Sequence, residues 1–287
     1  MAMRSIQTML NTITSVAKHD DRVRAVIMNG SRVNPAVKKD KFQDYDIVFY
    51  VDDYQTFPKD KEWIKVFGDV LIMQTKDDQL DASLDEAWYI YLMQFKDGNR
   101  IDLSIRDIKD FSQDIQEDSL TRVLINKDNY PVNIPSPNES SYYINKPTEK
   151  EIRCTINECY WVSLCVAKGL AREHILYAMD HLAIVRNQLR MMLTWWVGYK
   201  TDFKTSIGKS ENRLKKYIDS SWYERLLKTF PSTNKDEIYG SLYTLLDLFH
   251  EVTLAVIRYE NISYDNALLN MIKSTIKKRY QMIKSYE

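Results

Sequence analysis

Three stretches decide the expected fold: Gly30-Ser31-Arg32, Asp44-Tyr45-Asp46 and Arg100-Ile101-Asp102-Leu103-Ser104. The first follows an apolar run from Val23 to Met28 and the second leads into another from Ile47 to Val51, both typical of β-strands. A glycine directly after a strand permits a tight turn whose backbone amides can approach a phosphate group. The pattern predicts a sheet that carries a phosphate-approaching turn and three carboxylates.

The spacing of the aspartates suggests that they act together. Asp44 and Asp46 are two residues apart, so in extended backbone their side chains point to the same face. In the stretch Arg100 to Arg106 the apolar residues occupy one face, which places Asp102 on the polar face. If the two strands are neighbours, the three carboxylates converge and can bind magnesium. Two such ions can clamp the attacking and leaving oxygens around one phosphorus.

The turn supplies complementary chemistry for a phosphate group. Gly30 allows close approach of the backbone, Ser31 adds a hydroxyl donor and Arg32 adds positive charge. Each feature also has an ordinary explanation, because Gly-Ser pairs are common in turns and alternating aspartates often mark a solvated strand face. Their ordered combination favours an enzyme that transfers a nucleotidyl group.

Composition narrows the class of protein. The chain of 287 residues is too long for one small core, which favours two domains. Its 40 basic and 40 acidic residues balance, so no nucleic-acid partner is expected. Hydrophobic residues make up 44%, yet no apolar run approaches the roughly 20 residues of a membrane span. The N-terminus lacks the apolar core of a signal peptide, which predicts a soluble, cytoplasmic protein.

Cysteine and histidine offer no metal motif. Cys154, Cys159 and Cys165 lie in one segment that we expect to be helical, with spacings that match no zinc or redox site. Buried free thiols are the simplest interpretation. The four histidines are scattered, so a metal site built on histidine is improbable.

A proline-rich connector marks the expected domain boundary. Four prolines between residues 128 and 148 exclude a helix or a central strand there. Before it, runs at 23–28, 47–51, 70–74, 88–95 and 101–105 predict strands, with helical stretches before Val23 and around 62–67 and a hairpin turn at Asp97-Gly98. After it, Thr148 to Glu151 has the spacing of a capping box, and apolar residues then recur at helical spacing.

Longer stretches around these residues carry a resemblance to a known family. They cover most of the chain: 29–35, 42–47 and 95–103 in the first half, and Asn157-Glu158 with Trp161, 167–173, 180–182 and 189–192 in the second. The first group resembles the nucleotidyltransferases related to DNA polymerase beta. With the second group, the chain resembles their aminoglycoside 6-adenylyltransferase branch, which inactivates streptomycin.

The resemblance implies an α+β fold with two domains. A nucleotidyltransferase domain with a mixed sheet and flanking helices is expected over residues 1–135. An all-α helical-bundle domain that contacts substrate and nucleotide is expected over 148–287. The implied activity is transfer of AMP from ATP to the 6-hydroxyl of streptomycin with release of pyrophosphate, which confers resistance to the antibiotic.

Site residues follow from the same resemblance. Asp44 and Asp46 would hold two Mg²⁺ ions, while Asp102 would complete the metal site and act as the base on the attacking hydroxyl. The turn at Gly30, with Ser31 and Arg32, would grip the triphosphate of ATP. Phosphoryl-type transfer depends mostly on positioning and charge, so no histidine base is required.

The second half offers further candidates. Ser206 to Lys209 is expected to open a short helix whose dipole would help Lys209 meet the β- or γ-phosphate. The resemblance suggests Lys168 as a second phosphate contact, although a lysine on a solvated helix face is an equally good interpretation. Streptomycin is a polycation that needs carboxylates and flat surfaces. Glu158, Trp161 and Asp180 are the residues chosen for that task, although acids on helices usually face water and helical tryptophans usually lie in the core.

Two alternatives remain open. The same metal site could adenylylate a different aminoglycoside or another acceptor, or the chain could be a nucleotide-binding module without turnover. The retained Asp44, Asp46 and Asp102 argue against the module. The expected partners are ATP and aminoglycosides, with no membrane association and a monomer or weak dimer.

Overall fold

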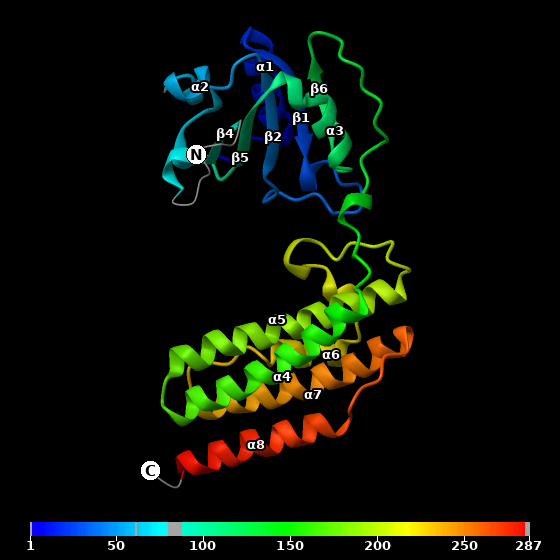
Figure 1. Ribbon diagram of the computed structural model, residues 1–287. Coiled ribbons are helices and arrows are strands. Elements are labelled where there is room, and N and C mark those ends of the chain that lie inside the picture. The colour runs from blue at the N-terminus through cyan, green and yellow to red at the C-terminus, as the bar shows by residue number, and fades with distance from the viewer. Residues whose placement is uncertain (1, 61, 80–87, 285–287) are drawn as a thin grey trace. The chain divides into compact units, whose positions relative to one another are not determined.

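The computed structural model describes residues 2–60, 62–79 and 88–284. The chain divides into two compact units, with the boundary along the chain between Ser141 and Tyr142. We call residues 1–141 the sheet unit and residues 142–287 the helical unit, and each is described by itself (Figure 1).

The sheet unit contains a mixed sheet with the strand order β3-β4-β5-β2-β1-β6. β2 and β5 run parallel, whereas every other neighbouring pair is antiparallel. The expected α+β class with a mixed sheet is therefore confirmed. The strands are β1 (Val23–Asn29), β2 (Tyr45–Val51), β3 (Val70–Thr75), β4 (Trp88–Phe95), β5 (Arg100–Asp107) and β6 (Arg122–Asn126).

Alternation along β2 gives the sheet two different faces. Tyr45, Ile47 and Phe49 are buried in one core together with Met9 and Ile13 of the long helix α1 (Ile6–His19). The intervening residues belong to the opposite face, where Tyr50 packs edge-on against Phe111 of α3 (Phe111–Glu117). Tyr50 also donates a hydrogen bond to Asp114, and Arg106 of β5 pairs with the same carboxylate. The even-numbered side chains of β2 and β5 therefore share the face opposite the Met9 and Ile13 core.

Some elements of the sheet unit differ from the sequence expectation. β6 was not predicted, because only Val123, Leu124 and Ile125 form its apolar run. The helix expected around residues 62–67 is a 3-10 helix, Trp63–Phe67, and the short helices α2 (Thr56–Lys59) and α3 were not predicted. Short elements carry too few residues to show a period.

The helical unit consists of helices packed around one core. Its α-helices are α4 (Glu149–Ala171), α5 (Ile175–Lys200), α6 (Ser220–Leu227), α7 (Lys235–Glu260) and α8 (Ala267–Lys284). The predicted capping box is confirmed: the amide of Glu151 donates to the Thr148 hydroxyl, and the Thr148 amide donates to the Glu151 carboxylate. Glycine at position 169 lets α4 approach α5 closely, since a Cβ there would lie 2.8 Å from the Tyr177 ring.

Two features of the helical unit qualify the sequence expectations. Of the three cysteines, only Cys159 is fully buried, whereas Cys154 is exposed because it lies on the outer side of α4. Within the described residues, α7 is the one helix whose length and composition would suffice to cross a membrane. More than half of that apolar window is buried among the other helices, as in the core helix of a globular domain.

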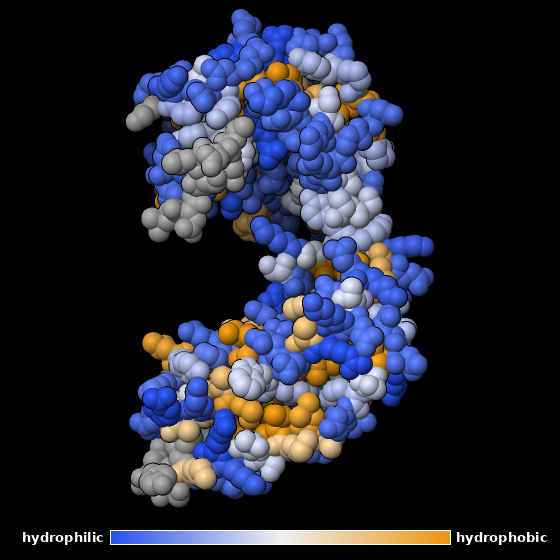
Figure 2. Space-filling view, viewed as in Figure 1, coloured by the Kyte–Doolittle hydropathy of each residue, from blue (hydrophilic) through white to orange (hydrophobic). Residues whose placement is uncertain are grey.

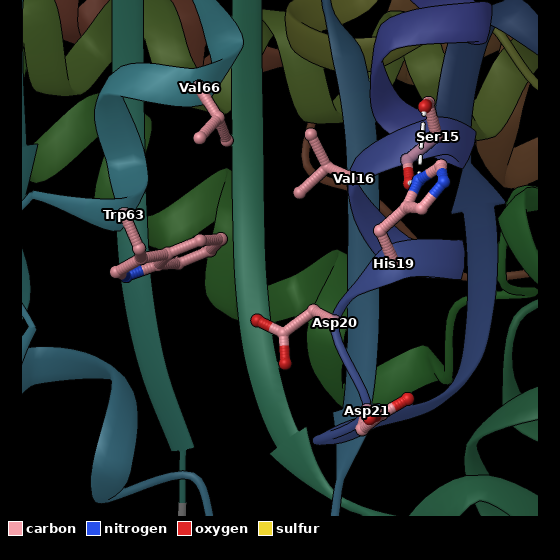
Figure 3. A pocket seen from close by; sticks show the side chains of 7 residues that line it. All are labelled: Ser15, Val16, His19, Asp20, Asp21, Trp63 and Val66. Atoms are coloured by element: carbon pink, nitrogen blue, oxygen red, sulfur yellow. Dashed lines mark hydrogen bonds between the residues drawn. The ribbon is translucent and has the colours of Figure 1, made fainter.

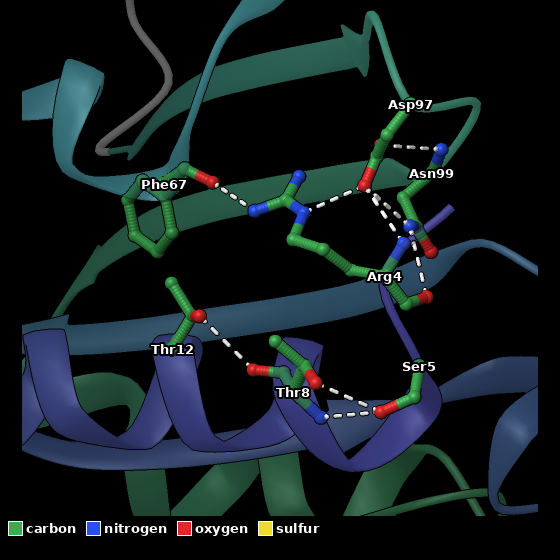
Figure 4. A network of polar contacts seen from close by, with 7 residues as sticks. All are labelled: Arg4, Ser5, Thr8, Thr12, Phe67, Asp97 and Asn99. Atoms are coloured by element: carbon green, nitrogen blue, oxygen red, sulfur yellow. Dashed lines mark hydrogen bonds and ion pairs between the residues drawn. The ribbon is translucent and has the colours of Figure 1, made fainter. Parts of the chain in front are cut away.

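The β4–β5 hairpin is anchored to the N-terminal segment through Asp97 (Figure 4). Its side chain, 2% exposed, accepts hydrogen bonds from the backbone amide and Nε of Arg4 at 3.1 and 2.6 Å. Asn99 donates two more from its amide and side chain. Burial would raise the pKa of Asp97, but these hydrogen bonds outweigh it and hold that pKa well below its usual range. Gly98 completes the predicted hairpin turn with a φ of +86°.

We predict that Asp97→Asn lowers the free energy of unfolding by about 2 kcal/mol at pH 7, because an amide cannot accept all four donors. A depressed folded-state pKa stabilises the fold fully above the unfolded pKa of about 3.9, and the effect is lost as the pH falls further. Urea unfolding at pH 7, 5 and 3 should therefore show an equal difference between the two proteins at pH 7 and 5 and a smaller difference at pH 3. Asp128→Asn, which weakens exposed contacts of this carboxylate with Arg24 and Tyr130, is the control and should change stability little. An equally small effect at Asp97 would contradict the anchoring role.

Candidate active site

Strand pairing brings the three aspartates to one edge of the sheet. In the parallel pair, Asp46 of β2 lies directly opposite Asp102 of β5. In the antiparallel pair with β1, Asp46 lies opposite Asn29, the residue before the Gly30 turn. Asp44 precedes β2 by one residue. The strand beginnings of β2 and β5 and the end of β1 therefore meet at the acidic residues.

The turn after β1 is pressed against the Asp46 carboxylate. Gly30 has a φ of +73° and begins the 3-10 turn Gly30–Arg32. A Cβ atom on Gly30 would lie 2.3 Å from Oδ2 of Asp46, so no larger residue fits without displacing that side chain. The half-buried Ser31 makes no side-chain hydrogen bond to the described residues, which leaves its hydroxyl available to a ligand.

Arg32 contacts the backbone at the start of β2. Its guanidinium donates to the backbone carbonyls of Asp44 and Gln43, at 3.0 and 2.5 Å. It also lies over the ring of Tyr45, with 3.6 Å between the guanidinium carbon and the ring centre. The residue is buried and its donors are directed toward the start of β2. In this conformation Arg32 positions the backbone that carries Asp44.

A second cation, Lys39, holds the same loop from the other side. Its ammonium donates to the carbonyls of Ser31, Arg32 and Asn34 at 2.9, 2.7 and 2.8 Å. The side chain of Gln43 adds another hydrogen bond to the Ser31 carbonyl. Sequence reasoning missed both residues, because nothing in the spacing of a polar loop shows which lysine turns inward. The loop between β1 and β2 is nonetheless tied to the Gly30–Arg32 turn at several points.

Arg100 is the third cation at the site, and it contacts the aspartates directly. Its Nε and Nη2 donate to the two carboxylate oxygens of Asp102 at 2.7 and 2.8 Å. Its Nη1 lies 3.6 Å from Oδ2 of Asp44. Hydrogen bonding to Asp102, opposed in part by burial, raises the pKa of Arg100. Strand parity could have identified this residue, since positions 100 and 102 share a face.

The donor set fits a hard divalent cation. Three carboxylates from two paired strands lie at one sheet edge beside a glycine turn, and oxygen ligands are those that magnesium prefers. In the part of the chain that the structure describes, no three His, Cys, Asp or Glu side chains are already grouped at metal-binding distances. At the acidic residues, the guanidinium of Arg100 bridges Asp102 and Asp44 instead. These carboxylates would hold a metal once that bridge loosens.

The two lysines chosen in the helical unit are exposed. Lys209 begins a three-residue 3-10 turn after Gly208, and Ser210 within it has a positive φ. The prediction of a short helix at this position is therefore wrong. A single irregular turn supplies no useful helix dipole. Lys168 lies on the solvent side of α4, with its ammonium 5.4 Å from the ring centre of Tyr177.

The three residues chosen for the acceptor also lie on the surface of the helical unit. Trp161 is 67% exposed, which is unusual for tryptophan and excludes the core role that helical spacing usually indicates. Glu158, one turn before it on α4, and Asp180 on α5 are exposed and have no ion-pair partner among the described residues. Hydrophobic side chains also reach the surface of this unit (Figure 2).

Two cavities lie away from all of these residues. One, of about 450 Å³, is at the end of α1, where Trp63, His19 and Asp20 line it (Figure 3). Asp20 is already paired with Arg22, and the His19 ring hydrogen-bonds the Ser15 carbonyl. The other, of about 360 Å³, is lined by Trp196 and Trp222 in the helical unit. Neither contains a residue chosen from the sequence.

Comparison with known proteins shows the family of the chain. A family model described as streptomycin adenylyltransferase matches residues 3–278. The chain is 34% identical over 283 residues to an aminoglycoside 6-adenylyltransferase of Staphylococcus aureus, covering 97% of this chain and all of that one. It is 35% identical over 274 residues to the enzyme of the same name from Bacillus subtilis (strain 168), covering 93% and 96%.

A crystal structure of an aminoglycoside 6-adenyltransferase from Bacillus subtilis is also similar, with 30% sequence identity and a TM-score of 0.47. The match covers 97% of this chain and 99% of that one. The family model spans both units, and the two curated relatives exceed 30% identity over nearly their whole lengths. The chain therefore belongs to the streptomycin adenylyltransferase family of nucleotidyltransferase enzymes.

Proposed function

We propose that this protein transfers AMP from ATP to the 6-hydroxyl of streptomycin, releases pyrophosphate and thereby confers resistance to the antibiotic. The observation that carries the proposal is the register that sets Asp46 opposite Asp102, with the Gly30 turn against the Asp46 carboxylate. This arrangement offers carboxylates for metal ions beside a turn for phosphate. The names of the curated relatives support an aminoglycoside as acceptor.

In the proposed reaction, the acceptor oxygen attacks the α-phosphorus of ATP. A new P–O bond forms as the bond to the bridging oxygen of the β-phosphate breaks, and pyrophosphate leaves. The hydroxyl proton passes to the Asp102 carboxylate, which faces the polar side of β5. Both Asp102 oxygens accept hydrogen bonds from Arg100, so one of these contacts must open before that oxygen can meet the acceptor hydroxyl.

Asp44, Asp46 and Asp102 would hold two Mg²⁺ ions, which supply positive charge to the triphosphate when bound. The Gly30 backbone and the Ser31 hydroxyl would contact phosphate oxygens. Arg32 would act through Asp44, whose carbonyl it binds, instead of on the nucleotide.

We assign the catalytic role to residues 1–135 and contacts with both substrates to residues 148–287. Lys209 and Lys168 would approach the phosphates, while Glu158 and Asp180 would pair with the cationic groups of the acceptor. Trp161, with its exposed ring, offers a flat surface for a guanidinium or sugar. We further propose that the enzyme acts in the cytoplasm on small molecules alone, as a monomer or weak dimer.

Incubation of the protein with ATP, Mg²⁺ and streptomycin should add one adenylyl group to the antibiotic, detected by mass spectrometry. Spectinomycin, kanamycin and lincomycin serve as the acceptor panel, and they should remain unmodified. Modification of another acceptor but not streptomycin would exclude the proposed substrate. Absence of turnover with every acceptor would favour a nucleotide-binding module.

Asp102→Asn should lower kcat by about a hundredfold or more, because it removes both the base and a metal ligand. Circular dichroism and thermal melting should show an intact fold. Asp107→Asn is the matched control and should retain activity. Asp107 lies on the same strand, and its carboxylate binds the ammonium and the backbone amide of Lys109. Substantial activity in Asp102→Asn would exclude this residue as the base.

Gly30→Ala should also lower activity by about a hundredfold, since the new methyl group displaces the Asp46 carboxylate. Gly240→Ala on α7 is the matched control, because a Cβ there meets nothing within 4 Å. This control should keep full activity and raise the free energy of unfolding by about 0.5–1 kcal/mol, as expected for a helical glycine. Equal activity in both variants would mean that the turn does not position Asp46.

A further inference from the structure

We propose that Arg100 is the internal counter-ion of the acidic site, whose guanidinium bridges Asp102 and Asp44 and competes with divalent cations for these carboxylates. The inference rests on the proposed function, in which the same aspartates bind metal. In this role Arg100 binds neither metal nor phosphate. It opposes metal binding by occupying the carboxylates.

The geometry of β5 makes the contact between Arg100 and Asp102 intrinsic to the strand. Residues 100 and 102 are two positions apart, so their side chains point to the same face of the sheet. The pairing of β5 with β4 and β2 fixes the backbone on both sides. The guanidinium meets both oxygens of Asp102 in a two-point contact, at 2.7 and 2.8 Å. Such forked pairs are directional and stronger than single hydrogen bonds. Asp102 is thus held in one orientation by its own strand.

The same guanidinium reaches across the strand gap to the second acid. Its Nη1 is 3.6 Å from Oδ2 of Asp44, which belongs to the segment that enters β2. Carboxylates held this close repel one another, and a cation between them offsets that repulsion. Arg100 therefore keeps Asp44 and Asp102 near each other in the absence of metal.

Competition follows from the same contacts. A divalent cation that binds Asp102 must share oxygens that already accept from the guanidinium, and it must approach a fixed positive charge. Arg100 is 37% exposed, so water screens this repulsion in part. With a water-like dielectric, removing one positive charge at about 5 Å should tighten binding of a divalent ion by about tenfold.

The test is a titration of the nucleotide-free protein with Mn²⁺ at low ionic strength, in which electron paramagnetic resonance counts the free ion. Arg100→Met and Arg100→Gln should each bind Mn²⁺ about tenfold more tightly than the wild type. The glutamine variant keeps a hydrogen-bond donor without the charge, so it separates charge from hydrogen bonding. Arg100→Lys keeps the charge and should stay within about threefold of the wild type.

Arg106→Met is the matched control. Arg106 lies on the same strand and face, is also 37% exposed and is paired with Asp114 instead of the site aspartates. It should leave Mn²⁺ affinity unchanged. Circular dichroism of each variant checks the fold, and damage to the site would weaken Mn²⁺ binding, which is the opposite direction.

Asp46→Asn reports separately on the metal site. If it weakens Mn²⁺ binding while folded Arg100→Met and Arg100→Gln bind no more tightly than the wild type, the counter-ion role is overturned and the metal site stands. If Asp46→Asn binds Mn²⁺ as the wild type does, or if the wild type binds none, the metal site fails and the role of Arg100 fails with it.

Discussion

The parallel pairing of β2 with β5 is the constraint on which the site depends. The two strands are far apart in the chain, and their register alone sets Asp46 opposite Asp102. A slip by one residue would turn one of these side chains into the apolar core. The buried residues that alternate with the acids, such as Ile47, Ile101 and Leu103, resist that slip because their burial stabilises only one register. The packing of the core of the sheet unit thus determines where the Asp46 and Asp102 carboxylates lie.

Three basic residues arrange the site before any ligand arrives. Arg32 and Lys39 are directed to backbone carbonyls of the loop between β1 and β2, while Arg100 is directed to the acids themselves. Each orders one component: the start of β2, the glycine turn and the Asp102 carboxylate. Preorganisation of this kind matters in nucleotidyl transfer, where positioning and charge provide most of the rate enhancement.

Much of this architecture could be predicted, for identifiable reasons. Long runs with a clear period predicted β1, β2, β4 and β5, and parity placed Asp44, Asp46 and Asp102 on one face. The capping box at Thr148 was visible because it depends on local spacing. The hydrogen bonds of Arg32 and Lys39 to backbone carbonyls were not predictable, since they depend on how the loop between β1 and β2 folds back on itself. The helix predicted at Lys209 was wrong, because Ser210 and Glu211 have positive φ values that their residue types do not predict.

The carbonyl cradle around Lys39 also makes three neighbouring lysines unequal. Lys38, Lys39 and Lys41 share one short polar segment, yet only Lys39 has its ammonium enclosed by Ser31, Arg32 and Asn34 carbonyls. Lys41 merely lies beside the ring of Phe42. Loss of Lys39 would remove its ammonium from the Arg32 and Asn34 carbonyls and leave the Ser31 carbonyl to the Gln43 amide, whereas the Lys38 side chain is exposed. We therefore expect substitutions in this segment to be tolerated at exposed positions and to disturb the turn when they remove the Lys39 ammonium.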